Sequence, residues 1–307
     1  MHISETTGRL VLTVATIATV LSTLSSPGDA QRRQPTPEQR ARMMEQLQQQ
    51  LKADRPIPAP DTIWIEDMTW MEVRDAMADG KTTVLVTSGG VEQNGPYLVT
   101  GKHNVILKGT CEAIARALGD ALCAPVIKLV PEGNIDPPSG HMMFPGTLSV
   151  REETYQAMLT DVASSLAAHG FEHIVFLGDS GGNQRGMATV AEALNTKWTG
   201  GDSRVHYIPE YYRYEELFAW SQADDGLGIE EPVNEGLHDN YPITAMMMVI
   251  DPTSVRYDER KATGKASING VALDPVDETL EAGRKLIDKK VDEAVAAIRA
   301  SIAGSSE

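Results

Sequence analysis

Short apolar runs alternate with longer segments of helical periodicity from Ile63 onward. The runs have the length of strands and are Val84–Val86, Val126–Val130, Ile174–Leu177 and Val205–Ile208. The longer segments repeat apolar residues every three or four positions and are Val105–Leu118, Glu152–Ala168, Gly182–Lys197, Tyr211–Ser221 and Asp277–Ile302. Such alternation is typical of βα units. The pattern therefore predicts an α/β fold, a three-layer α/β/α domain with a mostly parallel sheet.

Residues 1–30 have the features of an export signal. Arg9 supplies a positive charge, Leu10–Leu24 is apolar and uncharged, and small residues lead up to Ala30. The apolar run is shorter than the about 20 residues that a membrane span needs. We therefore expect a signal peptide cut after Ala30, rather than an uncleaved anchor, and a periplasmic or secreted protein.

The remaining chain divides into an arm and a domain. Residues 31–60 form a polar, proline-bounded arm in which Glu38–Lys52 has the periodicity of a helix. Residues 61–304 carry the alternating pattern, and their length suits one sizeable α/β domain.

Charge and cysteine content narrow the class of protein. The formal net charge of −16 argues against nucleic acid and anionic membranes as partners. The two cysteines, Cys111 and Cys123, can pair in an oxidising compartment. The favoured interpretation is nevertheless two buried thiols, because a free cysteine packs as a small hydrophobe.

Polar residues and glycines gather in four loops that follow the apolar runs. These loops are Ser88–His103, Pro131–Thr147, Gly178–Gln184 and Asn234–Thr244. Open α/β sheets bind their ligands at the carboxyl ends of the strands. We therefore expect the four loops to open on one edge of the sheet and to form the functional site.

Three histidines fall in these loops and are candidates for chemistry. Glu92, His103 and Asp179 offer carboxylate and imidazole groups that suit zinc or manganese, and a metal-bound water would then be the nucleophile. His141 and His238 are candidates for orienting a substrate or transferring a proton, since imidazole titrates near neutral pH.

Ser180 allows a different interpretation of the third loop. It lies in the string GDSGG, at a predicted strand-to-helix turn, which is where α/β hydrolases place a serine nucleophile. His238 or His141 would then act as its base. The plainer interpretation is that Asp179 and Ser180 cap the following helix.

Four motifs in these loops together resemble the creatininase (creatinine amidohydrolase) family, from about Ile65 to Arg284. The motif H-x-x-F-P-G-T is complete at His141–Thr147, and it is the most specific match. The family's opening motif G-[ST]-x-E-Q-H-G is similar to Gly89–Gly95, its N-G-H-G-G-N motif to Gly178–Asn183, and its H-A-G motif to His238–Asn240.

The resemblance implies an α/β/α domain, often oligomeric, that binds two divalent metals and hydrolyses a cyclic or linear amide C–N bond. Several positions depart from the family's metal ligands, and they are Asn94, His103, Ser180 and Ile243. A two-metal site with the usual ligands is therefore absent. Either His103 and Asp179 replace lost ligands around one metal, or the site is free of metal.

We accordingly expect an exported hydrolase that acts on an amide-type C–N bond of a small molecule. At most one zinc or manganese ion per chain and a homo-oligomeric state are expected. No nucleic acid is expected as a partner, and no membrane after cleavage of the signal. The alternatives are a metal-free serine hydrolase using Ser180 and a non-catalytic small-molecule-binding member of the family.

Overall fold

The computed structural model describes residues 36–305, so the predicted signal peptide lies outside the described residues. The described chain divides after Asp54 into two units. The first contains helix α1 (Pro37–Lys52), which begins with a capping box between Thr36 and Gln39. Its apolar stripe is exposed and consists of Met43, Met44, Leu47 and Leu51. The predicted helix in the arm is thus present.

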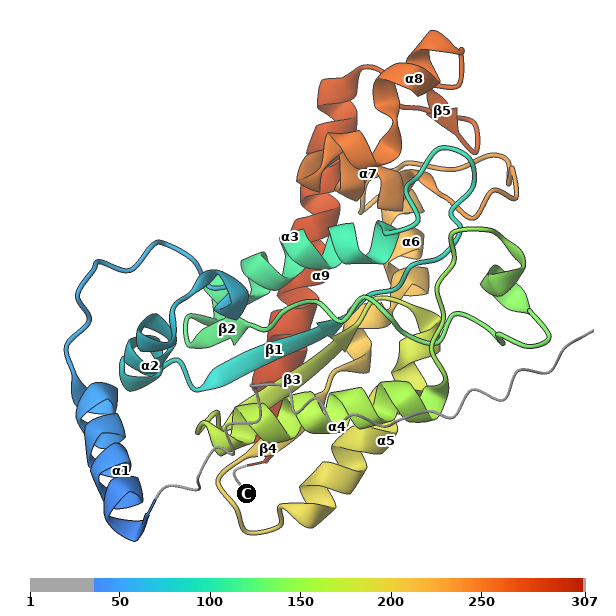
Figure 1. The fold of residues 1–307 in the computed structure, drawn as a ribbon. Helices are drawn as coiled ribbons and strands as arrows, with labels where there is room; N and C mark the ends of the chain where they lie inside the picture. The colour runs from blue at the N-terminus through green and yellow to red at the C-terminus, as the bar shows by residue number, and fades with distance from the viewer. Residues whose placement is uncertain (1–35, 306–307) are drawn as a thin grey trace, which may run out of the picture. The chain divides into compact units, whose positions relative to one another are not determined.

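A four-stranded parallel sheet forms the centre of the second unit (Figure 1). Its strands are β1 (Thr83–Ser88), β2 (Ala121–Cys123), β3 (His173–Gly178) and β4 (Arg204–Tyr207). Their order is β2-β1-β3-β4, and every neighbouring pair is parallel. β1 is buried along its whole length, and accordingly its centre, Val84–Val86, is an apolar run without alternation.

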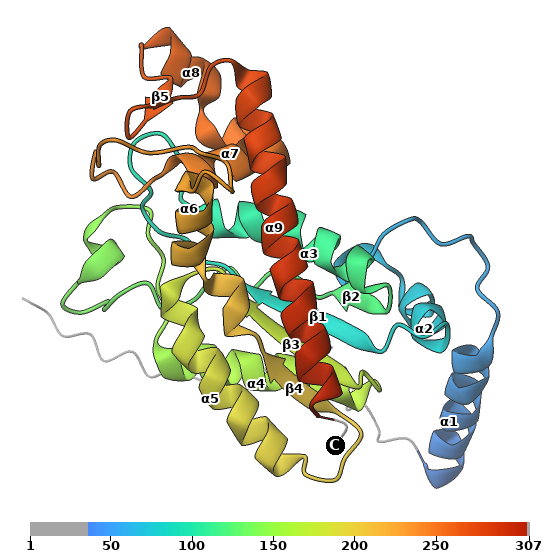
Figure 2. The ribbon, with the colours of Figure 1, turned by 180° about the vertical axis from the view of Figure 1, so that it is seen from behind.

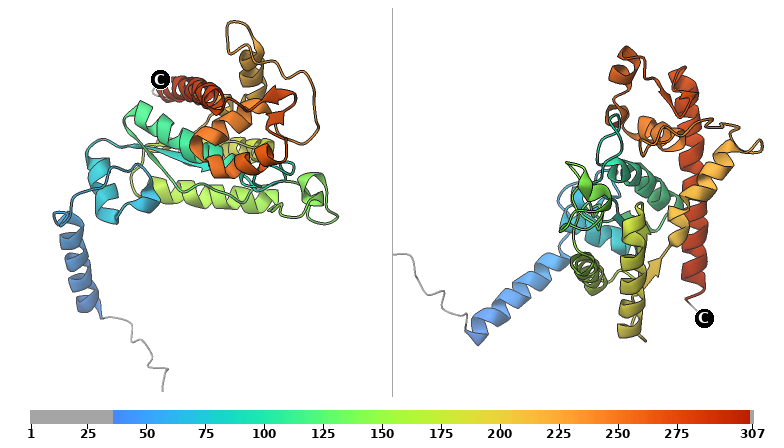
Figure 3. Two further views of the ribbon diagram at one scale, coloured as in Figure 1. Left: turned by 90° about the horizontal axis from the view of Figure 1, so that it is seen from above. Right: turned by 90° about the vertical axis from the view of Figure 1, so that its right-hand side faces the viewer.

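Helices cover both faces of this sheet, as the view from above shows (Figure 3). Helices α3 (Lys102–Leu118) and α9 (Val276–Ala303) lie on one face. Helices α4 (Glu152–Ala168) and α5 (Gly181–Lys197) lie on the other, and the reverse view shows α9 crossing the sheet and extending beyond it toward α7 (Figure 2). The predicted three-layer α/β/α architecture is therefore confirmed.

The connections create a crevice between β1 and β3. After β1 the chain passes through α3 to β2, and it then returns through α4 to β3 on the opposite side of β1. The two strands pair as far as Ser88 and Gly178, where the loops that follow them diverge. Such a switch point is where open α/β sheets bind ligands.

Most of the remaining elements build a second apolar layer beyond α3. They are α6 (Tyr214–Gln222), α7 (Tyr241–Ile250), α8 (Tyr257–Ala262), β5 (Ser267–Ile268) and β6 (Val271–Ala272). Helix α2 (Trp70–Ala78) instead packs against the core of the four-stranded sheet. Short 3-10 turns lie in the connections between elements, at Ile65–Asp67, Gly140–Met143, Pro209–Tyr212 and Pro252–Val255. Across residues 36–305, no helix has both the length and the apolar character that crossing a bilayer requires.

Three predicted elements are corrected. The run Val126–Val130 is not a regular strand: Pro125 lacks an N–H for a sheet ladder, and Ile127 forms only a bridge with Ser88. The strand β2 lies just before it. The predicted helix Tyr211–Ser221 is a 3-10 turn followed by α6. Helix α7 begins inside the predicted loop Asn234–Thr244.

Cys111 and Cys123 form a disulfide. The favoured prediction of two free thiols is therefore wrong. Helix α3 packs beside β2, and this brings the two Cα atoms, 12 positions apart in the sequence, to 6.4 Å. The sequence shows both cysteines as apolar positions, but it does not show that the helix and the strand place them face to face.

Candidate functional site

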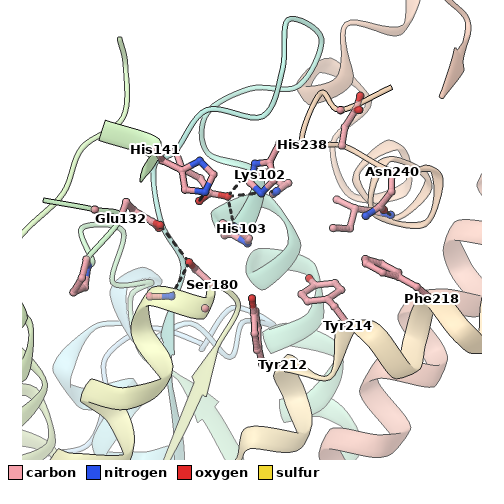
Figure 4. A pocket seen from close by; sticks show the side chains of 18 of the residues that line it. Lys102, His103, Glu132, His141, Ser180, Tyr212, Tyr214, Phe218, His238 and Asn240 are labelled. Carbon is pink, nitrogen blue, oxygen red and sulfur yellow. Dashed lines mark hydrogen bonds and ion pairs between the residues drawn. The ribbon is translucent and has the colours of Figure 1, made fainter. Parts of the chain in front are cut away.

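All four predicted loops line one pocket of about 710 Å³ at the carboxyl edge of the sheet (Figure 4). The loop after β1 contributes Glu92, and the loop after β3 contributes Ser180. Glu132 and His141 come from the loop around the second 3-10 turn, and His238 comes from the segment before α7. The expectation that the loops converge is confirmed.

Glu92, His103 and Asp179 form a buried chain of hydrogen bonds. His103 Nδ1 lies 2.8 Å from Asp179 Oδ2, and His103 Nε2 lies 2.8 Å from Glu92 Oε1. Burial opposes a charge on His103, but the hydrogen bonds to the two carboxylates outweigh it and raise the pKa of the imidazole. Each ring nitrogen faces a carboxylate oxygen, so the two contacts together favour the doubly protonated, cationic imidazole, in which both nitrogens donate.

The same arrangement fixes the charge of Glu92. Burial alone favours the neutral acid, but the hydrogen bond from His103 and the charges of His103 and Lys102 hold the pKa of Glu92 well below its usual range. The ammonium of Lys102 lies 3.4 Å from Glu92 Oε1. Glu92 is therefore an ionised carboxylate that two buried cations hold in place.

Asp179 is fully buried and is held from the opposite side. Tyr214 donates its hydroxyl to Asp179 Oδ1 at 2.7 Å, and the ammonium of Lys290 lies 3.6 Å from the same oxygen. Lys290 also donates to the carbonyl of Tyr211, and it lies over two tyrosine rings. Burial lowers the pKa of Lys290 to about 8.

Glu92 also faces two histidines that reach it from different loops. His141 Nε2 lies 3.2 Å from Glu92 Oε2, and the imidazole rings of His141 and His238 are 4.5 Å apart. One ligand atom from each of the three residues lies within 4.8 Å of the others. Burial and the charge of Lys102 lower the pKa of His238, which favours the neutral, metal-binding imidazole.

The backbone holds His238 in a conformation that residues with side chains adopt rarely. Its φ is 59°, and its Nδ1 is hydrogen bonded to the carbonyl of Gln93 at 2.9 Å. The other ring nitrogen is thereby directed away from Gln93. Backbone strain of this kind persists where the surroundings fix it and is common at binding sites.

Ser180 lies in the pocket wall but has no histidine partner. Its hydroxyl donates to Glu132 Oε2 at 3.3 Å and accepts from the N–H of Gly182 at 3.3 Å, at the N-cap of α5. Within residues 36–305, no histidine hydrogen bonds to Ser180. The prediction that Ser180 caps the helix is met by this geometry, whereas a serine–histidine pair is not formed.

Sequence reasoning did not single out Glu132, Lys290 or Tyr214. Burial, together with the negative charge of Glu92, raises the pKa of Glu132 to about 8, so this acid is protonated near neutral pH. Its position directly after an apolar run was a usable signal, since Glu92 also lies just beyond such a run. Lys290 and Tyr214 lie within helical patterns, and no sequence signal separates them from other helical residues.

Comparison with known proteins supports the assignment of the fold and the family. The creatininase family model, described as creatinine amidohydrolase, matches residues 66–298. The creatinine amidohydrolase of Pseudomonas putida is 22% identical over 203 residues, which cover 64% of this chain and 75% of the relative.

Solved structures of creatininases share the fold at low sequence identity. A mutant creatininase, solved in a Zn–Zn form and in complex with creatine, aligns with a TM-score of 0.56 and 19% identity. A manganese creatininase aligns with a TM-score of 0.55 and 19% identity. Each alignment covers 78% of this chain and 98% of the solved chain. Because the family model spans most of the chain and includes all four loops of the pocket, the chain belongs to the creatininase family.

Proposed function

We propose that this protein hydrolyses the amide-type C–N bond, cyclic or linear, of a small molecule with the help of one bound divalent metal. The observation that carries the proposal is the convergence of Glu92, His141 and His238 on one side of the pocket. The amidohydrolase relatives support the reaction class.

The donor set fits one zinc or manganese ion. Two imidazole nitrogens and one carboxylate oxygen are the ligands of many catalytic zinc sites, which leave a further position open. We expect no second ion, because Asn94, Ser180 and Ile243 stand where the resemblance to the family places metal ligands. The amide nitrogen of Asn94 donates to the carbonyls of Glu92 and Val99. The ammonium of Lys102 further opposes more positive charge at this place.

This ligand set differs from the predicted set of Glu92, His103 and Asp179. A ring nitrogen that donates a hydrogen bond has no lone pair for a metal, and both nitrogens of His103 face carboxylates. The geometry favours His103 and Asp179 as residues that orient Glu92, as second partners of metal-bound carboxylates do.

A bound ion would supply Lewis acidity and a water of lowered pKa. The residues of the chain have separate tasks around it. His103 holds Glu92 Oε1, so that Oε2 stays directed toward His141. Glu132 places a protonated carboxyl group in the same pocket, beside Ser180.

The alternative functions have less support. A serine hydrolase needs a base that activates Ser180, and the partner of that hydroxyl is Glu132 rather than a histidine. A non-catalytic binding protein has no need for a converged carboxylate and two imidazoles. The prediction of metal-dependent hydrolysis therefore stands ahead of both.

The experiment incubates the protein with a panel of small cyclic and linear amides. Hydrolysis is measured as the release of amine or ammonia. We expect chelation to abolish hydrolysis, zinc or manganese to restore it, and Ser180→Ala to keep most of it. Hydrolysis that survives chelation, together with labelling of Ser180 by a fluorophosphonate probe, would contradict the proposal.

We also propose that the protein is exported. The disulfide between Cys111 and Cys123 supports this, because such bonds persist in oxidising compartments. Protein from the native host should begin at Gln31 on N-terminal sequencing. An intact N-terminus in a cytosolic fraction would contradict export. The expected homo-oligomer and the absence of nucleic-acid and membrane partners stay predictions, and light scattering tests the first.

A further inference from the structure

Lys102 is a buried cation at the pocket, and the proposed function gives it only its ion pair with Glu92 and no contact with the substrate. It is the first residue of α3, its side chain is 4% exposed and close to Glu92, and it lines the pocket. Figure 4 shows its place beside His103 and His238. Its ammonium carries three hydrogen-bond donors. In the part of the chain that the structure describes, its one polar contact is the ion pair with Glu92 Oε1 at 3.4 Å.

Lys290 shows what a purely structural buried lysine looks like in the same protein. Its ammonium donates to the carbonyl of Tyr211 and lies 3.8 and 4.0 Å from the centres of two tyrosine rings. It also faces Asp179. Lys290 is not among the residues that line the pocket. The surroundings thus satisfy Lys290, whereas Lys102 keeps free donors at the pocket.

The shared carboxylate makes this contrast stronger. Glu92 Oε1 already accepts a shorter hydrogen bond from His103 at 2.8 Å, and Oε2 faces His141 at 3.2 Å. Burying an ammonium with one long, shared partner costs free energy. A negatively charged oxygen in the pocket would supply the missing partner.

We propose that the ammonium of Lys102 binds the negatively charged oxygen that forms from the substrate carbonyl, and afterwards the product carboxylate. The inference rests on the proposed function. In the reaction, the oxygen of water bonds to the carbonyl carbon, and the electron pair of the C=O bond moves onto the carbonyl oxygen. The electron pair then returns to re-form the C=O bond as the C–N bond breaks. Both protons of the water end on the leaving nitrogen, so that amide and water give a carboxylate and a protonated amine.

The role has a physical rationale in the charge that develops. A fixed cation in a water-poor site stabilises a developing oxyanion without reorganisation, and loss of one such donor lowers kcat by about 10²–10³-fold. In the proposed function one metal ion is bound, so a second positive charge near the oxyanion would come from the chain. Lys102 is the lysine that lines this pocket.

The first test uses metal-free protein and acetate as the carboxylate probe, and follows the amide signals of the pocket by NMR. Saturable shifts are expected in the wild type and in Lys108→Met, an exposed control on the same helix. Binding at least tenfold weaker is expected in Lys102→Met. Equal affinity in Lys102→Met, or no saturable binding in the wild type, would overturn the proposal.

A second measurement keeps the test decisive if Lys102→Met folds poorly. The side-chain NMR signal of the Lys102 ammonium in the wild type should shift with the same acetate affinity, and an unmoved signal would overturn the proposal. In the metal-loaded enzyme, Lys102→Met should lower kcat by about 10²–10³-fold with its metal content unchanged. Acetate binding through Lys102 without any amide hydrolysis would instead refute the proposed function and leave the anion site standing.

Discussion

Lys290 allows a quantitative test of the buried network behind the site. Its side chain is 4% exposed, and burial lowers its pKa from 10.5 to about 8. Between these two values the unfolded chain binds the proton more strongly than the folded protein does. Stability therefore rises with pH in this window, because the unfolded state holds more protons.

The size of the effect follows from the shift. One pKa unit corresponds to about 1.4 kcal/mol, so the free energy of unfolding contributed by Lys290 should rise by about 2.5 kcal/mol from pH 7 to pH 10. Lys290→Met removes the titrating group and fills nearly the same space. The free energy of unfolding of Lys290→Met minus that of the wild type should therefore fall by about 2.5 kcal/mol from pH 7 to pH 10.

The assay is urea unfolding of the wild type and Lys290→Met at pH 7, 8, 9 and 10. Circular dichroism monitors the loss of helix. The matched control is Lys289→Met, the neighbouring and more exposed lysine of α9, whose side chain is 28% exposed. Subtracting the free energy of unfolding of the wild type at each pH removes the pH dependence that tyrosines and other lysines contribute to both proteins. A difference between Lys290→Met and the wild type that stays constant with pH would refute the assigned burial of the charge.

Three further predictions concern other parts of the chain. Burial lowers the pKa of His206 from 6.5 to about 4, so protonation of His206 should cost the wild type about 3 kcal/mol of stability between pH 7 and pH 4. Unfolding measured across this pH range should show that His206→Asn lacks this loss. Gly182→Ala would place a Cβ atom 1.9 Å from the carbonyl oxygen of Pro131, so calorimetry should show destabilisation of about 1–3 kcal/mol, and an unchanged Tm would contradict it. Reduction of the bond between Cys111 and Cys123 should lower the stability by about 3 kcal/mol in denaturant unfolding with and without a reductant, and equal midpoints would argue against the disulfide.

The layered fold was predictable because each of its signals is local. The buried runs of β1 and β3 and the periodicity of α4 identify strands and helices without any knowledge of packing. Helix α7 was missed because its own residues are apolar on every face. Its sequence therefore has no helical period and cannot be told from a short buried strand or apolar loop. The strand β2 has only three residues, which is too short for a pattern.

The candidate site was predictable as a set of loops but not as a set of contacts. Glu92, His103 and Asp179 do meet, yet their order along a hydrogen-bonded chain depends on where α3 begins relative to the end of β3. The sequence offers no sign that both nitrogens of His103 are taken. The pairing of Glu92 with His141 and His238 likewise depends on two long loops folding over β1.

The central claim is that one divalent metal binds between Glu92, His141 and His238. The most direct measurement is anomalous diffraction from crystals grown with zinc, collected on both sides of the zinc absorption edge. The account predicts one peak per chain, bounded by these three side chains, and its loss in His141→Ala. Two peaks per chain, or a single peak between His103 and Asp179, would contradict the account.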